Sequence, residues 1–225
     1  MLINAGGMLK AIRMIQDAKK ESGKTPKELI ADLHPARPDF RGFQLAEVTL
    51  SLEADPSFDE IKDAGATVST NSEAHTVLDD MFLISGAIPR TTSYENGAKY
   101  GVQYKASEDI WVKDELIMDE RFVMCNLKDK GLIVFTGCGH AGVVNTSRHA
   151  VELAGHKLPL HAVVGGFHLG NSVIEDIQAT VKDLKELDPK ILLPGHCTGW
   201  RAKLEIEKQM PGRLVPCVVG TKFTF

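Results

Sequence analysis

One pattern occurs three times between residues 131 and 200: a short apolar run, a turn that contains glycine, and a histidine. The histidines are His140, His168 and His196, so the same interval of 28 residues separates each from the next. That interval accommodates a strand, a turn, a helix and a return loop, which predicts a β-turn-α unit used twice and ending on a third strand. If the three strands are parallel neighbours, their carboxyl ends share the sheet edge at which open α/β sheets bind ligands. The spacing therefore predicts three imidazoles at one crevice.

Two helices are predicted between these turns. One covers residues 146–153 after Asn145, a residue type that caps helices. The other starts near Ser172, where Glu175 completes the spacing of a capping box, and it continues to Asp188.

The rest of the chain is less regular. A hairpin is predicted from residues 121–127 and 132–136, joined by a turn that ends at Gly131. The other predicted segments are a helix over residues 8–20, a short helix near residues 27–31, a strand over residues 47–52, a short helix over residues 55–63, a long loop over residues 86–110, and edge strands at residues 214–219 and 222–225. No domain boundary stands out, so we expect a single domain over residues 1–225.

Composition excludes several classes of function. The chain has 225 residues, of which 43% are hydrophobic and 25% charged, as in an ordinary globular protein. A net charge of −4 without a basic stripe predicts no nucleic-acid or anionic-membrane partner. No apolar run approaches the ~20 residues of a membrane span, and no signal-peptide pattern opens the sequence, so we expect a cytoplasmic protein.

Four cysteines lack a Cys-x-x-Cys pair, which favours reduced thiols over a disulfide framework. Cys138 and Cys197 stand in two of the histidine turns. Metal ligation and an incidental buried thiol are both open interpretations of these two residues.

Two kinds of chemistry compete for the first turn. Gly137, Gly139 and Gly142 have the G-x-G-x-x-G spacing of a dinucleotide-binding fingerprint between a strand and a helix. The next strand, however, ends in Gly165 and Gly166, without the acidic residue that this fold uses to bind a ribose. Dinucleotide binding therefore ranks below a metal site.

The metal interpretation uses the histidines. Neutral imidazole is a good ligand for zinc and similar ions, and catalytic zinc commonly has three protein ligands and an exchangeable water. We predict His140, His168 and His196 as ligands of zinc or another divalent transition metal. Arg90 and Arg201 are predicted to bind an anionic group of a small substrate, because guanidinium binds phosphate in bidentate fashion. The sequence assigns no catalytic residue.

Three stretches carry a wider resemblance: residues 131–146, 165–169 and 194–199. Together with residues 85–90 and 114–120, they resemble the metallo-β-lactamase superfamily. Within it, they are similar to the branch named for the dihydropterin ribofuranosylaminobenzene-phosphate synthase of methanopterin biosynthesis. The resemblance implies an α/β fold of the αββα-sandwich type with metal ions at one end. By position, His140 matches a ligand of the first metal and His196 a ligand of the second, while His168 stands where relatives often place a bridging carboxylate.

The resemblance also implies a function, namely hydrolysis or transfer at an ester or phosphoester of a small anionic, pterin-like substrate by metal-activated water. The family's first metal motif, His-x-His-x-Asp-His, is absent, because residues 1–5 hold its place before Gly6 and Gly7. We therefore expect an N-terminally truncated form of the fold, with impaired activity and at most partial metal occupancy. The alternative is a catalytically inactive binding or interaction module, in which exposed apolar surface favours self-association.

Overall fold

The structure is a computed structural model that describes residues 7–23 and 28–225. Residues 1–5, in the place of the absent metal motif, lie outside the described residues. Packing divides the chain into two compact units, Met1–Ser72 with Tyr100–Glu115 and Glu73–Lys99 with Leu116–Phe225. The expected single domain over residues 1–225 stays a prediction.

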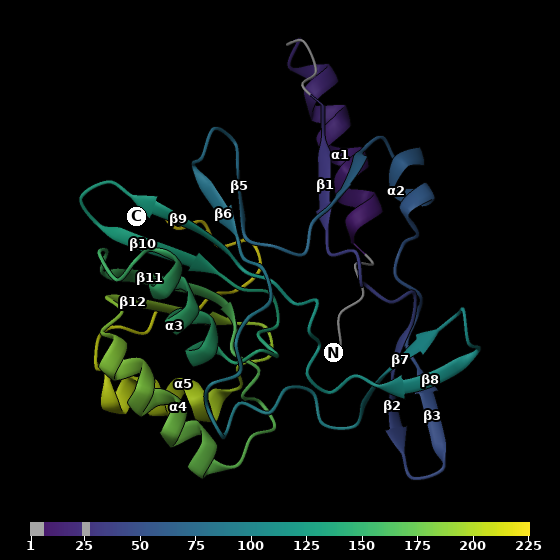
Figure 1. The fold of residues 1–225 in the computed structure, drawn as a ribbon. Coiled ribbons are helices and arrows are strands. Elements are labelled where there is room, and N and C mark those ends of the chain that lie inside the picture. The colour runs from purple at the N-terminus through teal and green to yellow at the C-terminus, as the bar shows by residue number, and fades with distance from the viewer. Residues whose placement is uncertain (1–6, 24–27) are drawn as a thin grey trace. The chain divides into compact units, whose positions relative to one another are not determined.

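The second unit is built on a six-stranded sheet with the order β12-β11-β10-β9-β6-β5 (Figure 1). Its strands are β5 (His75–Val77), β6 (Phe82–Ile84), β9 (Val123–Leu127), β10 (Gly131–Phe135), β11 (Leu160–Gly166) and β12 (Ile191–Gly195). The last three strands are parallel neighbours, whereas β9 pairs antiparallel with both β10 and β6. The predicted parallel strands before the histidine turns and the predicted hairpin are therefore confirmed.

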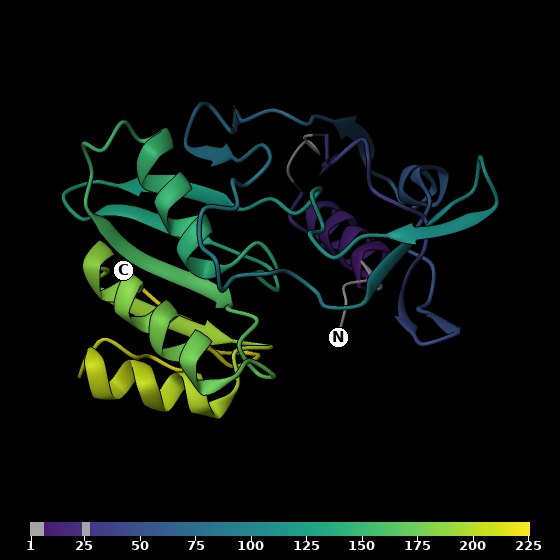
Figure 2. The ribbon, with the colours of Figure 1, turned by 60° about the horizontal axis from the view of Figure 1, so that its bottom comes forward.

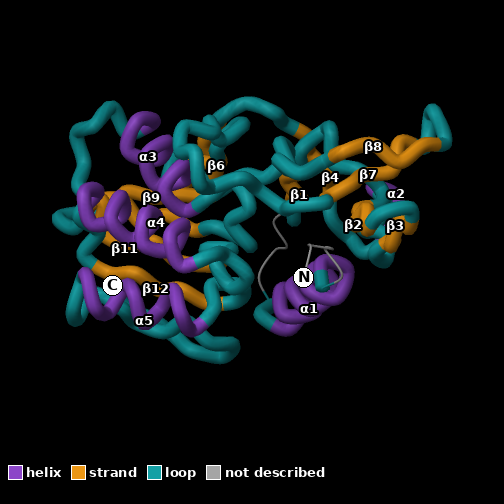
Figure 3. The backbone as a smooth tube through the Cα atoms, turned by 90° about the horizontal axis from the view of Figure 1, so that it is seen from below, coloured by secondary structure: helices purple, strands orange, loops and turns teal. Residues whose placement is uncertain are grey.

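Three helices cover one face of this sheet (Figures 2 and 3). They are α3 (Val143–Leu153), α4 (Ile174–Leu187) and α5 (Trp200–Gln209). The main core lies under them, where Val134, Val163 and Leu192 of the parallel strands pack with apolar residues of the helices. Because side chains alternate along a strand, the adjacent residues, Ile133, Ala162 and Leu193, face the other way. There they form a smaller cluster with Cys217 and Phe223 from the C-terminal tail.

The tail itself differs from prediction. Within residues 210–225, the structure has one isolated bridge, between Leu214 and Leu192, in place of the one or two predicted edge strands. The loop predicted over residues 86–110 is shorter in the structure than in the prediction, because β7 (Gly101–Lys105) of the first unit lies within it.

The first unit contains two small sheets. β1 (Ile30–Leu33) pairs parallel with β4 (Thr67–Thr70), and four antiparallel strands follow the order β3-β2-β7-β8. The remaining elements are β2 (Arg41–Leu45), β3 (Val48–Ser51), β8 (Ile110–Lys113), α1 (Met8–Glu21) and α2 (Phe58–Asp63). Ile12, Leu33 and Ile61 form the centre of a core between α1, α2 and the β1–β4 pair. The predicted short helix near residues 27–31 is wrong, since Ile30 and Ala31 belong to β1.

Within the described part of the chain, no helix has the length and apolar character needed to cross a membrane.

Candidate metal centre

The three histidine turns lie at one edge of the six-stranded sheet. Parallel pairing aligns Phe135 with Val164 and Gly166 with Gly195, so that β10, β11 and β12 end side by side. Close approach of their turns requires glycine. A Cβ atom on Gly139, whose φ is 76°, would lie 2.3 Å from the carbonyl oxygen of Gly166. A Cβ atom on Gly166 would lie 2.9 Å from the sulfur of Cys197.

His140 is buried and held by a carboxylate. Its Nδ1 lies 2.9 Å from Glu120 Oε1, and the side chain of Glu120 also accepts hydrogen bonds from the backbone N–H groups of Gly139, His140 and Ala141. Burial raises the pKa of Glu120, but the hydrogen bonds from His140 and the backbone outweigh it and hold that pKa below its ordinary value. An ionised Glu120 keeps the proton of a neutral His140 on Nδ1.

The other nitrogen of His140 is the informative atom. With Nδ1 protonated, Nε2 carries a lone pair, yet it is buried without a hydrogen-bond partner. Leaving a buried polar atom unpaired costs about 1–3 kcal/mol. A metal ion accepts such a lone pair, so the chemistry of this atom fits the metal that the sequence predicts.

His168 faces His140. Their ring centroids are 4.5 Å apart, and Nδ1 of His168 lies 3.5 Å from the sulfur of Cys138. Cys138, His140 and His168 offer donor atoms that all lie within 4.8 Å of one another. The backbone of His168 is left-handed, with φ of 50°, a conformation that costs an ordinary residue on the order of 1 kcal/mol. Such strain at a strand end is typical of functional positions.

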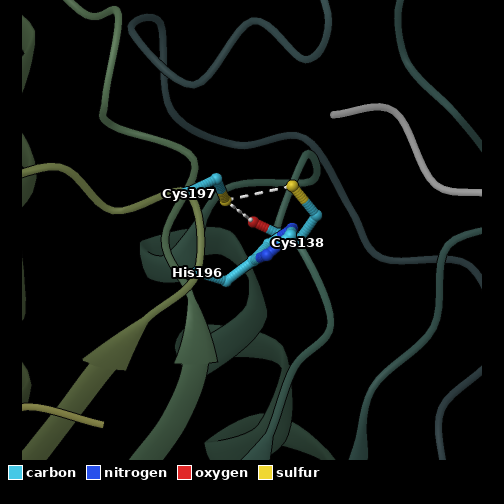
Figure 4. A group of neighbouring side chains, drawn as sticks. All are labelled: Cys138, His196 and Cys197. Atoms are coloured by element: carbon cyan, nitrogen blue, oxygen red, sulfur yellow. Dashed lines mark hydrogen bonds between the residues drawn. The ribbon is translucent and has the colours of Figure 1, made fainter. Parts of the chain in front are cut away.

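His196 joins a different group. It is exposed, has φ of 48°, and lies with Cys138 and Cys197, again with the three donor atoms within 4.8 Å of one another (Figure 4). Among the described residues, these are the two groups of three metal-binding side chains at that spacing. The structure therefore places two of the predicted histidines together and the third beside two thiols, with Cys138 common to both groups.

The two thiols are hydrogen-bonded to each other. The Cys138 thiol donates to Cys197 Sγ over 3.0 Å, and a protonated Cys197 donates to the carbonyl oxygen of Cys138, also over 3.0 Å (Figure 4). The hydrogen bond between the sulfurs lowers the pKa of Cys197 and raises that of Cys138. The shared hydrogen bond therefore favours the loss of one proton from the pair.

The predicted substrate-binding arginines lie in different surroundings. Arg90 is partly buried and donates through Nη2 to the carbonyl oxygens of Leu116 and Ile117, while its Nε and Nη1 atoms are buried without partners. Burial lowers the pKa of Arg90, and the charges of Glu120 and Glu95 oppose that shift. Arg201 is exposed and donates to the carbonyl oxygen of Ser172 over 3.0 Å.

Sequence reasoning missed two carboxylates, Glu120 and Glu95. Glu95 accepts hydrogen bonds from the backbone N–H groups of Val144 and Asn145 at the start of α3. The two carboxylates thus accept hydrogen bonds from the backbone N–H groups that a dinucleotide pyrophosphate would use. The geometry therefore does not favour the alternative of dinucleotide binding. Glu120 lies just before β9, the strand that pairs with β10, but no local sequence pattern marks its contact with His140.

Comparisons with known proteins agree with this architecture. No protein-family model matches the chain. Over 86 residues the chain is 36% identical to 7,8-dihydropterin-6-methyl-4-(β-D-ribofuranosyl)-aminobenzene-5'-phosphate synthase of Methanocaldococcus jannaschii, a match that covers 38% of this chain and 29% of that protein. Over 132 residues it is 30% identical to an uncharacterized protein of the same organism, covering 58% of this chain and 45% of that protein. The matches thus span less than half the length of both curated relatives.

A solved structure extends the comparison. The crystal structure of a metal-dependent hydrolase of the β-lactamase superfamily aligns with a TM-score of 0.72 and 23% identity, covering 89% of this chain and 72% of that chain. The resemblance seen in the sequence is therefore confirmed, and the fold of this chain is that of the metallo-β-lactamase superfamily.

Proposed function

We propose that this protein is a metal-dependent hydrolase or transferase that acts on an ester or phosphoester of a small anionic, pterin-like substrate. The observation that carries the proposal is the bare, buried Nε2 of His140, which Glu120 orients from the opposite side of the ring. The similarity to the pterin-pathway synthase supports the substrate class. The proposed ligands of the catalytic ion are the predicted histidines His140 and His168, while His196, the third predicted ligand, lies in the other group of donor atoms.

Each residue of the proposed metal centre has a separate role. Glu120 holds the proton at Nδ1 of His140 and so keeps the lone pair at Nε2. When bound, a divalent ion supplies Lewis acidity that polarises the bond under attack and makes water more acidic. His196 is exposed at the same strand edge, so a metal ion can reach its imidazole from solution.

The two arginines differ in what they offer a substrate. Arg201 is exposed at the start of α5 and is the residue that we propose binds the anionic group. Arg90 is proposed to act on substrate only indirectly, because its unpaired nitrogens are buried and its charge balances Glu120 and Glu95.

Metal reconstitution tests the proposal. The purified chain would be stripped with a chelator, reloaded with zinc, manganese or iron(II), and assayed for metal content and for hydrolysis of a chromogenic phosphodiester. We expect bound metal and turnover in the wild type, and loss of turnover together with a fall in metal content in His140→Asn and His168→Asn. His156→Asn is the matched control, because His156 is exposed and, like His168, has a left-handed backbone.

Two results would count against the enzyme. Less than about a tenth of an equivalent of metal after reconstitution would leave the inactive binding module as the better description. Full metal loading without turnover on phosphodiesters and carboxylic esters would do the same. The cytoplasmic location and self-association stay predictions that these assays do not address.

A further inference from the structure

We propose that Cys138, His196 and Cys197 form a thiolate site of their own, which takes zinc or a similarly soft divalent ion through two sulfurs and one imidazole. The sequence left these cysteines open between ligation and incidental burial, and the proposed hydrolysis does not require them. The inference rests on the proposed function only in that Cys138 also lies within reach of His140 and His168.

The spacing of the donor atoms fits zinc. Zinc bonds of about 2.3 Å to sulfur and 2.0–2.1 Å to nitrogen place tetrahedral ligands roughly 3.5–3.8 Å apart. In the structure the three donor atoms all lie within 4.8 Å of one another, and the two sulfurs are 3.0 Å apart. Ion binding therefore requires shifts of no more than about 1 Å in these side chains.

The backbone holds the sulfurs in place before any ion binds. Residue 138 follows β10 and residue 197 follows β12, so the sheet brings together thiols 59 residues apart in sequence. The turn that carries Cys197 is fixed by buried Thr198, whose hydroxyl donates to the carbonyl oxygen of Gly195 over 2.7 Å and accepts the N–H of Phe167. The N–H of Gly170 also donates to the carbonyl oxygen of Cys197 over 3.0 Å.

The three side chains of the thiolate site differ in exposure, so an ion can enter from one side. Cys138 is buried, Cys197 is half-buried and His196 is exposed. An ion can thus enter past His196, and a position remains for a fourth ligand from solution. Three protein ligands of the Cys₂His type with one open position are known for catalytic zinc.

The donor set also predicts which ions are excluded. Thiolate sulfur selects zinc and softer ions, whereas magnesium, calcium and manganese prefer oxygen ligands. The other two cysteines, Cys125 and Cys217, are free thiols outside both groups of metal-binding side chains. Cys125 lies on β9 and is half-buried like Cys197, which makes it the matched control.

Cobalt(II) titration of the full chain under a phosphine reductant is the test. Cobalt bound to thiolate gives a near-ultraviolet charge-transfer band, which imidazole ligands do not give. We expect the band in the wild type and in Cys125→Ser, a weaker band in Cys138→Ser and Cys197→Ser, and none in the double variant. Zinc should displace the cobalt and abolish the band, whereas magnesium in excess should not.

A second measurement needs no variant and so is independent of folding defects. Zinc should slow the alkylation of Cys138 and Cys197 by iodoacetamide, read by peptide mass spectrometry, and leave the rate at Cys125 unchanged. Alkylation rates at Cys138 and Cys197 that zinc leaves unchanged would overturn the proposal. An unchanged cobalt band in Cys197→Ser would do the same.

The outcomes separate this site from the proposed enzyme. A thiolate band in a wild type without hydrolytic activity would contradict the proposed function and support the thiolate site. Hydrolysis without a thiolate band would support the proposed function and contradict the thiolate site. His140→Asn should lose hydrolysis while it keeps the band, because His140 is not part of the thiol group.

Discussion

Glu120 holds His140 at Nδ1, and Nε2 on the other side of the ring is buried without a hydrogen-bond partner. Glu120 accepts hydrogen bonds from the Nδ1–H group of His140 and from three neighbouring backbone N–H groups, so it fixes the ring and the turn together. A partner of this kind raises the basicity of a metal-binding histidine and sets its orientation. We therefore expect Glu120 to affect metal affinity without touching the metal.

Replacing Glu120 with Gln tests this role. The amide keeps the size of the side chain, but its NH₂ group would face N–H donors, and its oxygen cannot serve all of them. We expect metal affinity to fall by about 10–100-fold and the free energy of unfolding to fall by about 1–3 kcal/mol. Zinc titration and urea unfolding would measure the two effects, with exposed Glu186→Gln as the control. Unchanged zinc affinity in Glu120→Gln would contradict the role.

The two arginines give a paired prediction. Arg90→Met removes a partly buried charge that balances Glu120 and Glu95, so we expect a loss of about 1–3 kcal/mol in unfolding free energy. Arg201→Ala removes an exposed charge, so we expect normal stability and a raised KM for the phosphodiester. Urea unfolding and steady-state kinetics on both variants would check the contrast. A large stability loss in Arg201→Ala, with KM unchanged, would reverse the assignment.

At the scale of elements, local patterns were good guides to strands and poor guides to helix starts. The apolar runs before the three histidines predicted β10, β11 and β12, because a buried parallel strand is visible in its own sequence. Helix α3 starts at Val143, and Asn145, the predicted cap, lies inside it, where its Oδ1 accepts hydrogen bonds from Thr91 and Thr92. Helix α4 likewise starts at Ile174 without a side-chain cap.

Distant partners explain what the sequence did not show. Strand β1 was predicted as a short helix because its partner, β4, pairs Thr67 with Ile30 and lies far along the chain. Glu120 reaches His140 across 20 residues, and no local pattern marks that contact. Topology placed the three histidines at one edge, whereas side-chain packing decided that His196 would join the thiols.

Glu95 takes the place of a local cap on α3, and it gives a pH prediction. Burial raises the pKa of Glu95 above its ordinary value of 4.5, against the hydrogen bonds that lower it. A carboxyl group with a raised folded-state pKa stabilises the fold below its unfolded pKa, and that contribution is lost as pH rises through the folded value. In Glu95→Gln the group no longer titrates, so this contribution is absent.

Urea unfolding of the metal-free wild type and of Glu95→Gln, from below pH 4.5 to neutral pH, would measure the effect. We expect the wild type to lose stability relative to the variant as pH rises. Other titrating groups largely cancel in this difference. A wild type that gains stability relative to Glu95→Gln over the same range would show that the hydrogen bonds outweigh burial at this carboxyl group.

At the scale of the whole molecule, the proposed ligands come from three strand ends of one sheet, so an ion bound there ties together segments far apart in sequence. An ion that binds the folded state alone stabilises it by about 2.7 kcal/mol when its free concentration is 100 times the dissociation constant. For a chain of this size each kcal/mol raises the Tm by roughly 2–4 °C, so we expect zinc to raise it by roughly 5–10 °C.

Thermal unfolding with zinc, with magnesium and after chelation would measure this shift. Zinc should raise the Tm, the chelator should reverse it, and magnesium should have little effect because the donors are nitrogen and sulfur. Hydrogen exchange should show the added protection in peptides that contain residues 136–140, 165–169 and 194–198. The variant with both His140→Asn and Cys197→Ser retains the sheet but lacks a ligand from each group, so its Tm should respond weakly to zinc. A shift of full size in that variant would mean that zinc binds elsewhere on the chain.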